Sequence, residues 1–330
     1  MKRKAQRRGE FDLIAKYFAP LARGEAGALG LTDDAAWLAP AAGHDFVVTT
    51  DAIVEGVHFL PGDPPASIAQ KALRVNISDL AAKGAKPRAY VLTAILPSLT
   101  GDDWLAAFAG GLKQDQKRFG LTLIGGDTVS TRGPLTLSIT AIGEVRCGRM
   151  VKRSGAQAGD DVWVSGTIGD AGLGLIQSTP QRLSLTAAHS RYLISRYQVP
   201  QPRLSLGMAL VGLAHACIDV SDGLVADLGH ICTASGVSIH INSADVPLSS
   251  AAAAAVAAGK ISIESLLTSG DDYELVFTAP QSARLQLAGI AAKLKVKIAR
   301  IGRAGGGEGV SVLDGDGKLR QFERQGFTHF

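Results

Sequence analysis

Acidic residues that stand beside glycine, serine or threonine are the side chains in this sequence best suited to chemistry. They are Asp33-Asp34, Asp51, Asp79, Asp127 in Gly125-Gly126-Asp127-Thr128, Asp219 and Asp222 in Asp219-Val220-Ser221-Asp222-Gly223, and the pair in Gly270-Asp271-Asp272. Two unit charges ~4 Å apart repel by about 4 kcal/mol at an effective dielectric constant of about 20. Gathered in one cleft, these carboxylates therefore predict bound cations, and oxygen ligands of this kind favour Mg²⁺.

Each of these segments taken alone also has a simpler interpretation. Asp33 and Asp34 fit a turn, Asp79 fits an exposed position on a helix, and Asp222 fits the cap of the helix that follows it. His58, seven residues after Asp51, fits a structural role as well as a functional one. The residues alone leave both interpretations open for each segment, and only the joint pattern favours a metal site.

A glycine pair precedes Asp127, and such a pair allows backbone N–H groups to face an anion while the carboxylate faces a metal. The phosphate fingerprints GxxxxGK[ST] and GxGxxG are absent in the right context, and no Ser/His/Asp triad or Cys/His metal spacing occurs. Carboxylates, Mg²⁺ and a positioned arginine are the parts that phosphoryl transfer uses. The residues thus predict a Mg²⁺-dependent enzyme that acts on phosphates, without a substrate.

Apolar runs predict the elements that position these acids. In the first half we expect a helix at 10–22, strand-like residues at 36–38, a buried strand at 46–50 that ends at Asp51, a helix at 67–83, a strand at 88–96, a helix at 101–119, a strand at 121–124 that ends at the glycine pair, and a strand at 135–145. In the second half we expect strands at 161–165, 237–241 and 273–278, a short strand before Asp219, and helices from residue 171 and at 186–197, 204–216, 224–234 and 251–258.

Length and composition predict two α/β domains. A chain of 330 residues exceeds the roughly 250–300 at which single cores stop growing, and 46% of its residues are hydrophobic. We place the boundary at 148–152, which gives a disordered basic tail at 1–8, an N-terminal domain at 9–150 and a C-terminal domain at 151–330. The formal charge of +4 comes from that tail, so the charge does not predict nucleic-acid binding.

The sequence shows no pattern typical of a secretory signal, a membrane span or a disulfide framework. The basic tail lacks a following apolar region, and no run of about 18 apolar residues occurs, so neither a secretory signal nor a membrane span is expected. Three cysteines without metal-ligand spacing fit reduced thiols. We therefore expect a cytoplasmic protein with no membrane partner.

Nine segments in order, from the first helix to the last residues, resemble the thiamine-monophosphate kinase family. They are GEFDLIAKYFAPLA from Gly9, GLTDDAA from Gly30, TTDAIVEGVHF from Thr49, NISDLAAKGAKP from Asn76, LIGGDT from Leu123, RSGAQAGD from Arg153, IDVSDGL from Ile218, SGDDYEL from Ser269 and GFTHF from Gly326. The resemblance covers nearly the whole chain. It implies a two-domain synthetase-like α/β fold, with an N-terminal mixed sheet that pairs into a barrel across a homodimer and a C-terminal domain that completes the cleft.

The resemblance also implies direct in-line transfer of the γ-phosphate of ATP to thiamine phosphate. It implies several Mg²⁺ ions, held by Asp34, Thr49, Thr50, Asp51, Asp79, Asp127, Asp219 and Asp222, and it admits a monovalent cation. It implies contacts to ATP from Gly126, Asp127, Arg153 and Ser221, and contacts to thiamine phosphate from His58, Asp271 and Phe327. Among the metal ligands, Asp51, Asp127 and Asp222 are the implied catalytic residues.

Three departures from the family pattern and two rivals accompany this interpretation. Asp271 stands where glutamate is usual, Thr32 lies in a loop that is often GIGDD or GPGDD, and Phe327 replaces tyrosine or tryptophan. One rival is a sibling synthetase, although a selenophosphate synthetase would carry a reactive cysteine and this chain has none before Cys147. The other rival is a non-catalytic nucleotide sensor on the same fold. Such a sensor is expected to have lost metal ligands, whereas this chain has all eight of the implied metal-binding residues.

Overall fold

The computed structural model describes residues 9–322 and 326–327, so the predicted tail at 1–8 lies outside the described residues. The chain forms two compact units. Unit 1 comprises residues 1–76 and 87–144, and unit 2 comprises residues 77–86 and 145–330. No helix in the described part of the chain combines the length and the hydropathy that crossing a bilayer requires.

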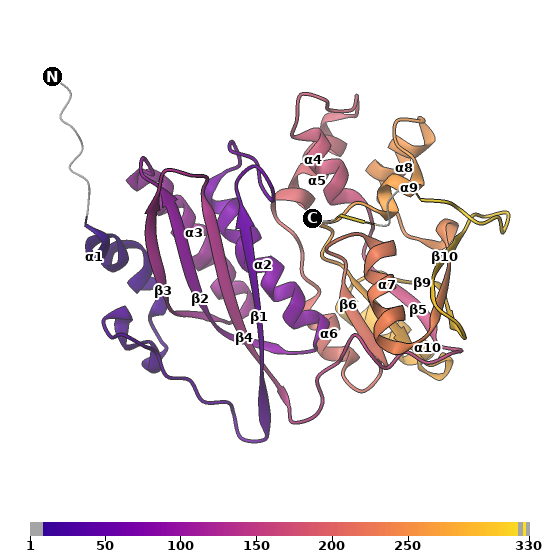
Figure 1. Cartoon of the computed structure of the whole chain (residues 1–330), viewed down its shortest axis with the longest axis horizontal. Helices are drawn as coiled ribbons and strands as arrows, with labels where there is room; N and C mark the ends of the chain where they lie inside the picture. The colour runs from indigo at the N-terminus through magenta and orange to yellow at the C-terminus, as the bar shows by residue number, and fades with distance from the viewer. Residues whose placement is uncertain (1–8, 323–325, 328–330) are drawn as a thin grey trace. The chain divides into compact units, whose positions relative to one another are not determined.

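Unit 1 is built on a four-stranded sheet in the order β1-β4-β2-β3. Its strands are β1 (His44–Val54), β2 (Lys86–Pro97), β3 (Thr122–Thr131) and β4 (Thr136–Arg146). Behind the sheet in Figure 1 lie the first part of α2 (Pro65–Ala82) and α3 (Asp102–Phe119). The side chains of β2 and β4 alternate between buried and half-buried, the pattern of a sheet with one face against helices.

Both edge strands of this sheet are longer than the sequence predicts. β1 continues to Val54, so the expectation that the strand ends at Asp51 is wrong. Ala52, Ile53 and Val54 keep the chain extended, because an acid on a half-exposed strand does not stop it. β3 likewise runs through Gly125 to Thr131 rather than ending at the glycine pair. The acids of both segments therefore lie within strands.

The helical segments at residues 19–22 and 26–31 pack along β3. Residues 10–22 are helical as expected, but as three short pieces: α1 (Glu10–Leu13), the π-helix η1 (Ile14–Phe18) and the 3₁₀ helix η2 (Ala19–Ala22). Phe11 is 83% exposed, whereas Tyr17, Phe18 and Leu21 are buried. The 3₁₀ helix η3 (Ala26–Leu31) follows, and the strand expected at 36–38 is irregular chain whose Ala36 and Leu38 pack with Ile124.

Unit 2 contains a six-stranded sheet in the order β10-β7-β9-β5-β8-β6. Its strands are β5 (Asp161–Ser165), β6 (Ala216–Asp219), β7 (Ser238–Asn242), β8 (Leu275–Ala279), β9 (Ile298–Gly305) and β10 (Gly309–Leu313). Helix α7 (Leu224–Ser235) buries its apolar side chains against one core of this unit. Helices α6 (Leu204–Leu210) and α10 (Arg284–Leu294) and the last turn of α2 share a second core with Cys217 and Phe277.

A satellite cluster of helices completes unit 2. It consists of α4 (Asp170–Gln177), α5 (Ala187–Gln198), α8 (Ser250–Ala257) and α9 (Ile263–Leu267), which bury a small apolar cluster of their own. The short 3₁₀ helices η4 (Ser243–Asp245) and η5 (Gln281–Ala283) precede α8 and α10 respectively. The helix expected at 204–216 ends at Leu210, since Gly212 adopts a φ of +82° that a helix cannot continue through.

Candidate active site

An acidic pocket in unit 1 joins two of the predicted segments. A cavity of about 120 Å³ is lined by Asp33 and Asp34 from the loop after η3 and by Gly125–Thr128 of β3. All three acidic side chains are exposed. Asp33 Oδ1 accepts a hydrogen bond from the Asp34 amide, and Asp127 Oδ1 accepts one from the Thr128 amide, each at 2.8 Å. One oxygen of Asp33 thus makes the hydrogen bond that a turn interpretation predicts, and the pocket gathers three of the predicted carboxylates.

Gly126 is required where it stands. Its φ is +151°, and a Cβ atom there would lie 1.9 Å from the carbonyl oxygen of Leu92 on the neighbouring strand. The parallel register of β2 and β3 shifts between Tyr90 and Val91, which is the irregularity that a glycine accommodates. The glycine pair therefore lets β3 carry Asp127 into the pocket without leaving the sheet.

Three predicted residues lie together on β1. Thr49 and Asp51 are half-buried and alternate with the exposed Thr50, whose hydroxyl donates to the Ile139 carbonyl at 3.2 Å and accepts from the Thr140 hydroxyl at 3.0 Å. Since successive side chains of a strand point to opposite faces, the Thr50 hydroxyl lies on the face opposite to Asp51. The hydroxyl of Thr50 is thus engaged within the sheet.

His58 follows β1 in a tight turn. Its Nδ1 accepts a hydrogen bond from the Val54 amide at 3.1 Å, and Lys71 Nζ donates to its backbone carbonyl at 2.7 Å. The first bond places the proton of the neutral ring on Nε2. The structural interpretation of His58 is therefore correct for one ring nitrogen, and its predicted contact with substrate stays a prediction.

The two catalytic acids predicted in unit 1 do not meet within one chain. Asp51 lies on β1 and Asp127 on β3, which are opposite edges of the sheet. Three inter-strand spacings separate these edges, or about 14 Å. The sequence analysis gathered both acids into one cleft, and the sheet order shows that a single copy of unit 1 does not do so.

Unit 2 buries a second acidic group. Asp219, at the end of β6, is 4% exposed, and burial, reinforced by the nearby Asp79, raises the pKa of its carboxyl to about 7. Asp79 is half-buried rather than exposed, so the simple helix-surface interpretation is wrong. Lys83, which the sequence analysis missed, donates to the Cys217 carbonyl at 3.1 Å, and burial lowers its pKa. The spacing of Asp79 and Lys83, one helical turn apart, was the available signal.

The turn between β6 and α7 is organised by an acid that the sequence analysis did not select. Asp227 Oδ2 accepts hydrogen bonds from the amides of Ser221, Asp222 and Gly223 at 3.1, 3.1 and 3.2 Å. Gly223 is the N-cap residue of α7 and no side chain caps it, so the capping interpretation of Asp222 is wrong. Burial raises the pKa of Asp227 to about 8, and the charges of Asp219 and Asp222 add to this rise.

Potential ligand atoms gather beside this turn. One atom each from Asp222, Asp227 and His230 lie within 4.8 Å of one another. The exposed Arg153 is close enough to Lys83 to lower its pKa further, and the Arg153 carbonyl accepts from the Ser235 hydroxyl at 3.4 Å. The predicted ATP contacts Arg153 and Ser221 thus lie in the same unit as Asp219 and Asp222.

Backbone hydrogen bonds tie two predicted substrate residues, Asp271 and Phe327, and the neighbouring Tyr273 to this turn. The Asp271 amide donates to the Ser221 carbonyl and the Tyr273 amide to the Val220 carbonyl, both at 2.8 Å. The amide of Phe327, whose side chain is 49% exposed, donates to the Asp222 carbonyl at 2.9 Å. The structure therefore brings Ser221, Asp222, Asp271 and Phe327 into one cluster of loops.

The donor set of these sites fits Mg²⁺. The potential ligands are mainly carboxylate oxygens, which hard divalent cations prefer. Burial raises the pKa values of the Asp219 and Asp227 carboxyls, and neighbouring carboxylates add to the rise. A bound divalent ion would compensate the charges of these carboxylates.

Comparisons with known proteins agree with this architecture. Residues 32–145 match the model of the AIR synthase related protein N-terminal domain, and residues 157–315 match that of the C-terminal domain. The thiamine-monophosphate kinase of Caulobacter vibrioides is 42% identical over 306 residues, which cover 92% of this chain and 86% of that protein. The fold and the acid-lined sites thus define an AIR synthase related protein.

Solved structures make the relationship more specific. The crystal structure of thiamine-monophosphate kinase from Stenotrophomonas maltophilia is 40% identical, with a TM-score of 0.84 over 94% of this chain and 98% of that one. AaThiL complexed with AMPPCP and TMP is 32% identical, with a TM-score of 0.77 over 99% of this chain and 100% of that one. The chain belongs to the thiamine-monophosphate kinase family.

Proposed function

We propose that this protein transfers the γ-phosphate of ATP to thiamine phosphate and forms thiamine diphosphate. The observation that carries the proposal is near full-length similarity to thiamine-monophosphate kinases, including AaThiL complexed with AMPPCP and TMP. The loops of unit 2 support it independently, because they join the acidic turn at Asp222 to Asp271 and Phe327. A thiazolium cation suits a carboxylate and an aromatic face.

The proposed roles follow the two acidic sites. Asp34, Asp127, Thr49 and Asp51 in unit 1, and Asp79, Asp219 and Asp222 in unit 2, would hold Mg²⁺, with a monovalent cation as a further cofactor. Bound Mg²⁺ would neutralise charge on the phosphate oxygens during transfer. Gly126, Asp127, Arg153 and Ser221 would orient ATP, while His58, Asp271 and Phe327 would orient thiamine phosphate. Because the acceptor phosphate is already ionised, no strong base is required.

Thr50 would take part through its backbone. The Glu55 amide donates to the Leu135 carbonyl, and the side chains of Thr50 and Thr140 are in contact, so β1 and β4 run antiparallel. In this register Thr50 lies opposite Thr140 in a pair that shares no backbone hydrogen bonds. The backbone carbonyl of Thr50 therefore points away from β4, toward the open edge of the sheet. Carbonyl oxygens are suitable ligands for these cations.

A homodimer would complete unit 1. β1 and β3 are the edges of its sheet, and Val48 and Val129 on them are 61% and 42% exposed. Closure of two such sheets into a barrel would remove these edges. If β1 of one copy adjoins β3 of the other, Asp51 and Asp127 meet across the dimer. Mixing the inactive variants Asp51→Asn and Asp127→Asn should then restore activity, and a mixture that stays inactive would contradict this arrangement.

The function is tested by measuring ADP release with ATP and Mg²⁺ in the presence of thiamine phosphate, thiamine or no acceptor. We expect release only with thiamine phosphate, with one thiamine diphosphate formed per ADP, and EDTA should stop the reaction until Mg²⁺ is added in excess. Silence with all three from a folded protein that binds ATP would favour a sibling synthetase or a sensor. A cytoplasmic location, which the three free cysteines support, stays a proposal.

A further inference from the structure

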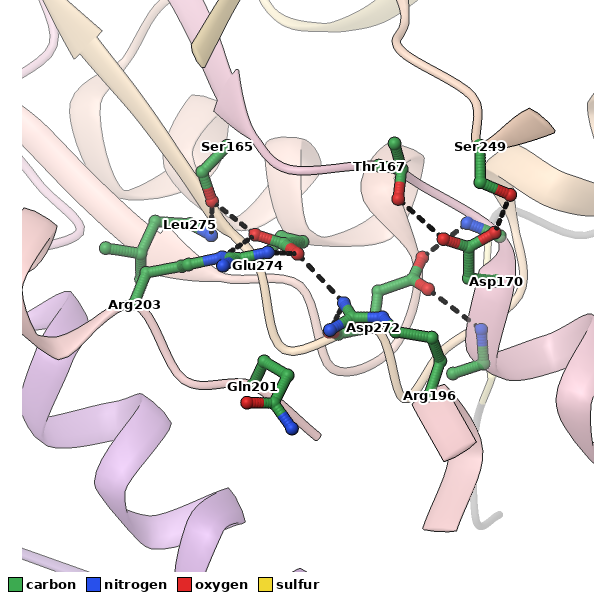
Figure 2. A network of polar contacts seen from close by, with 12 residues as sticks. Ser165, Thr167, Asp170, Arg196, Gln201, Arg203, Ser249, Asp272, Glu274 and Leu275 are labelled. Carbon is green, nitrogen blue, oxygen red and sulfur yellow. Dashed lines mark hydrogen bonds and ion pairs between the residues drawn. The ribbon is translucent and has the colours of Figure 1, made fainter. Parts of the chain in front are cut away.

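The segment from Asp271 to Glu274 contains two deeply buried acidic residues. Asp272 and Glu274 are 1% and 0% exposed. The amides of Gly169 and Ala171, at the start of α4, donate to the two oxygens of Asp272 at 2.6 and 3.1 Å. These contacts fix one side of the segment to α4, as Figure 2 shows.

Glu274 is fixed more firmly still. Its carboxylate accepts from Arg196 at 2.9 Å, from two nitrogens of Arg203 and from the Ser165 hydroxyl at 2.6 Å (Figure 2). Ser165 in turn accepts from the Leu275 amide at 2.8 Å. A buried carboxylate with three charge-assisted partners leaves the segment little freedom to shift.

The other two residues of this segment, Asp271 and Tyr273, adopt strained backbone conformations. Asp271 has a φ of +69° and Tyr273 a φ of +50°, values that residues other than glycine rarely adopt. Such conformations persist only where the surrounding structure enforces them, and they concentrate at functional sites. Here the anchors Asp272 and Glu274 enforce them, and the result is a hydrogen bond of 3.1 Å from the Tyr273 hydroxyl to Asp271 Oδ1.

We propose that Tyr273 is a positioning residue for thiamine phosphate, because its hydroxyl fixes the Asp271 carboxylate in the orientation that meets the thiazolium cation. This inference rests on the proposed function. Tyr273 is 8% exposed and its ring is held in place, so the hydroxyl is a rigid donor. Asp271 is one methylene shorter than the glutamate usual in the family, and a fixed carboxylate compensates for a shorter reach by losing less freedom on binding.

The test compares Tyr273→Phe with Tyr192→Phe in the full-length protein. Tyr192 is a matched control, since its hydroxyl also donates to a carboxylate, that of Asp170 at 2.8 Å, but away from the turn. We expect Tyr273→Phe to raise the KM for thiamine phosphate roughly tenfold, the factor that a hydrogen bond to a charged group contributes. Its kcat and its KM for ATP should stay near wild type. Tyr192→Phe should leave kcat and both KM values near wild type, whatever it costs in melting temperature through the loss of its bond to the buried Asp170.

A double-mutant cycle with Asp271→Ala shows whether Tyr273 acts through Asp271. We expect Tyr273→Phe to add nothing to the KM for thiamine phosphate once Asp271 is alanine. Independent additive effects, an unchanged KM in the single variant, or an equal rise in the KM for ATP would each overturn the inference while leaving the function intact. A wild-type protein that does not phosphorylate thiamine phosphate would overturn both.

Discussion

The acids of unit 1 and the acids of unit 2 are held in opposite ways. Asp33, Asp34 and Asp127 are exposed at the rim of a small pocket, and the carboxylates of Asp33 and Asp127 each accept one hydrogen bond from the amide of the next residue. Asp219, Asp227 and Asp272 are at most 4% exposed, and Asp227 and Asp272 accept two or three backbone hydrogen bonds each. Unit 2 therefore holds its carboxylates by burial and backbone hydrogen bonds, whereas unit 1 leaves its carboxylates exposed at the surface of the pocket.

This difference separates effects on turnover from effects on stability. Removing an exposed acid disturbs no buried partner, so its loss should appear in catalysis alone. Removing a buried acid leaves amides or guanidinium groups without their partner, which costs folding free energy whatever its role in catalysis. Substitutions in the two units should therefore sort into two classes.

The largest expected effect is on catalysis in unit 1. Asp51→Asn should lower turnover by on the order of 10³-fold, the scale of losing one charge-stabilising group. Because Asp51 is half-buried rather than fully buried, the free energy of unfolding should change by much less than in the buried-acid variants of unit 2. ADP release and urea denaturation measure the two quantities. Asp103→Asn, an exposed acid in the first turn of α3, is the matched control and should change neither. Near-wild-type turnover in Asp51→Asn would remove Asp51 from the proposed metal set.

The largest expected loss of stability lies in unit 2. Glu274→Gln leaves Arg196 and Arg203 without their buried partner and should lower the free energy of unfolding by about 3–5 kcal/mol. Glu264→Gln breaks a partly exposed pair with Arg320 and should cost less than about 1 kcal/mol. Urea denaturation of both variants measures the difference. An equal loss of unfolding free energy in both variants would mean that the burial of Glu274 does not increase the cost of removing its charge.

The buried acids also predict a pH dependence of stability. Burial raises the pKa of Asp272 from 3.8 to about 8, although the amides of Gly169 and Ala171 oppose this rise. The folded protein binds this proton more tightly than the unfolded chain, so unfolding free energy should fall as pH rises from about 4 to about 8, by at most ~1.4 kcal/mol per pH unit. Denaturation in EDTA across this range should give a flatter profile for Asp272→Asn than for the wild type or for the exposed control Asp245→Asn. Parallel profiles would refute the assignment.

The smallest expected effect concerns Thr50. Thr50→Val removes hydroxyl contacts with Ile139 and Thr140 but keeps the backbone carbonyl, so it should cost about 1 kcal/mol of stability and leave turnover within roughly threefold. Denaturation and ADP release again measure both. A loss of activity comparable to that of Asp51→Asn would show that the hydroxyl itself is the ligand.

Periodicity predicted much of the fold. Strand β5 and helices α3 and α7 begin within a residue or so of their expected positions, because apolar spacing and flanking glycine mark them. The errors in β1 and β3 came where an acid or glycine was read as the end of a strand. Asp51 and Gly125 both lie inside edge strands, where one side faces solvent and a polar residue carries little penalty. Residues 280–313, for which we made no prediction, contain α10, β9 and β10.

The sequence analysis predicted which residues belong to the candidate site, but not how the fold places them relative to one another. Asp34 with Asp127 and Asp79 with Asp219 were gathered correctly, since spacing places each near a glycine or on a helix face. Asp227 and Lys83 were missed, because a single acid or lysine on a helix does not reveal that it points into a buried turn. The strand order that separates Asp51 from Asp127 depends on pairing between distant segments, which local patterns do not encode.

Helix α2 is shared between the two units, which limits where the gene could be divided. Its first twelve residues belong to unit 1, whereas Ile77 to Ala82 belong to unit 2 and supply Asp79 to that unit's acidic group and Ala81 and Ala82 to its core. Neither unit is therefore one continuous piece of sequence. A gene split at 148–152 would encode a second fragment lacking Asp79 and part of its own core, so the two halves could be separated or exchanged with a relative only by carrying residues 77–86 along.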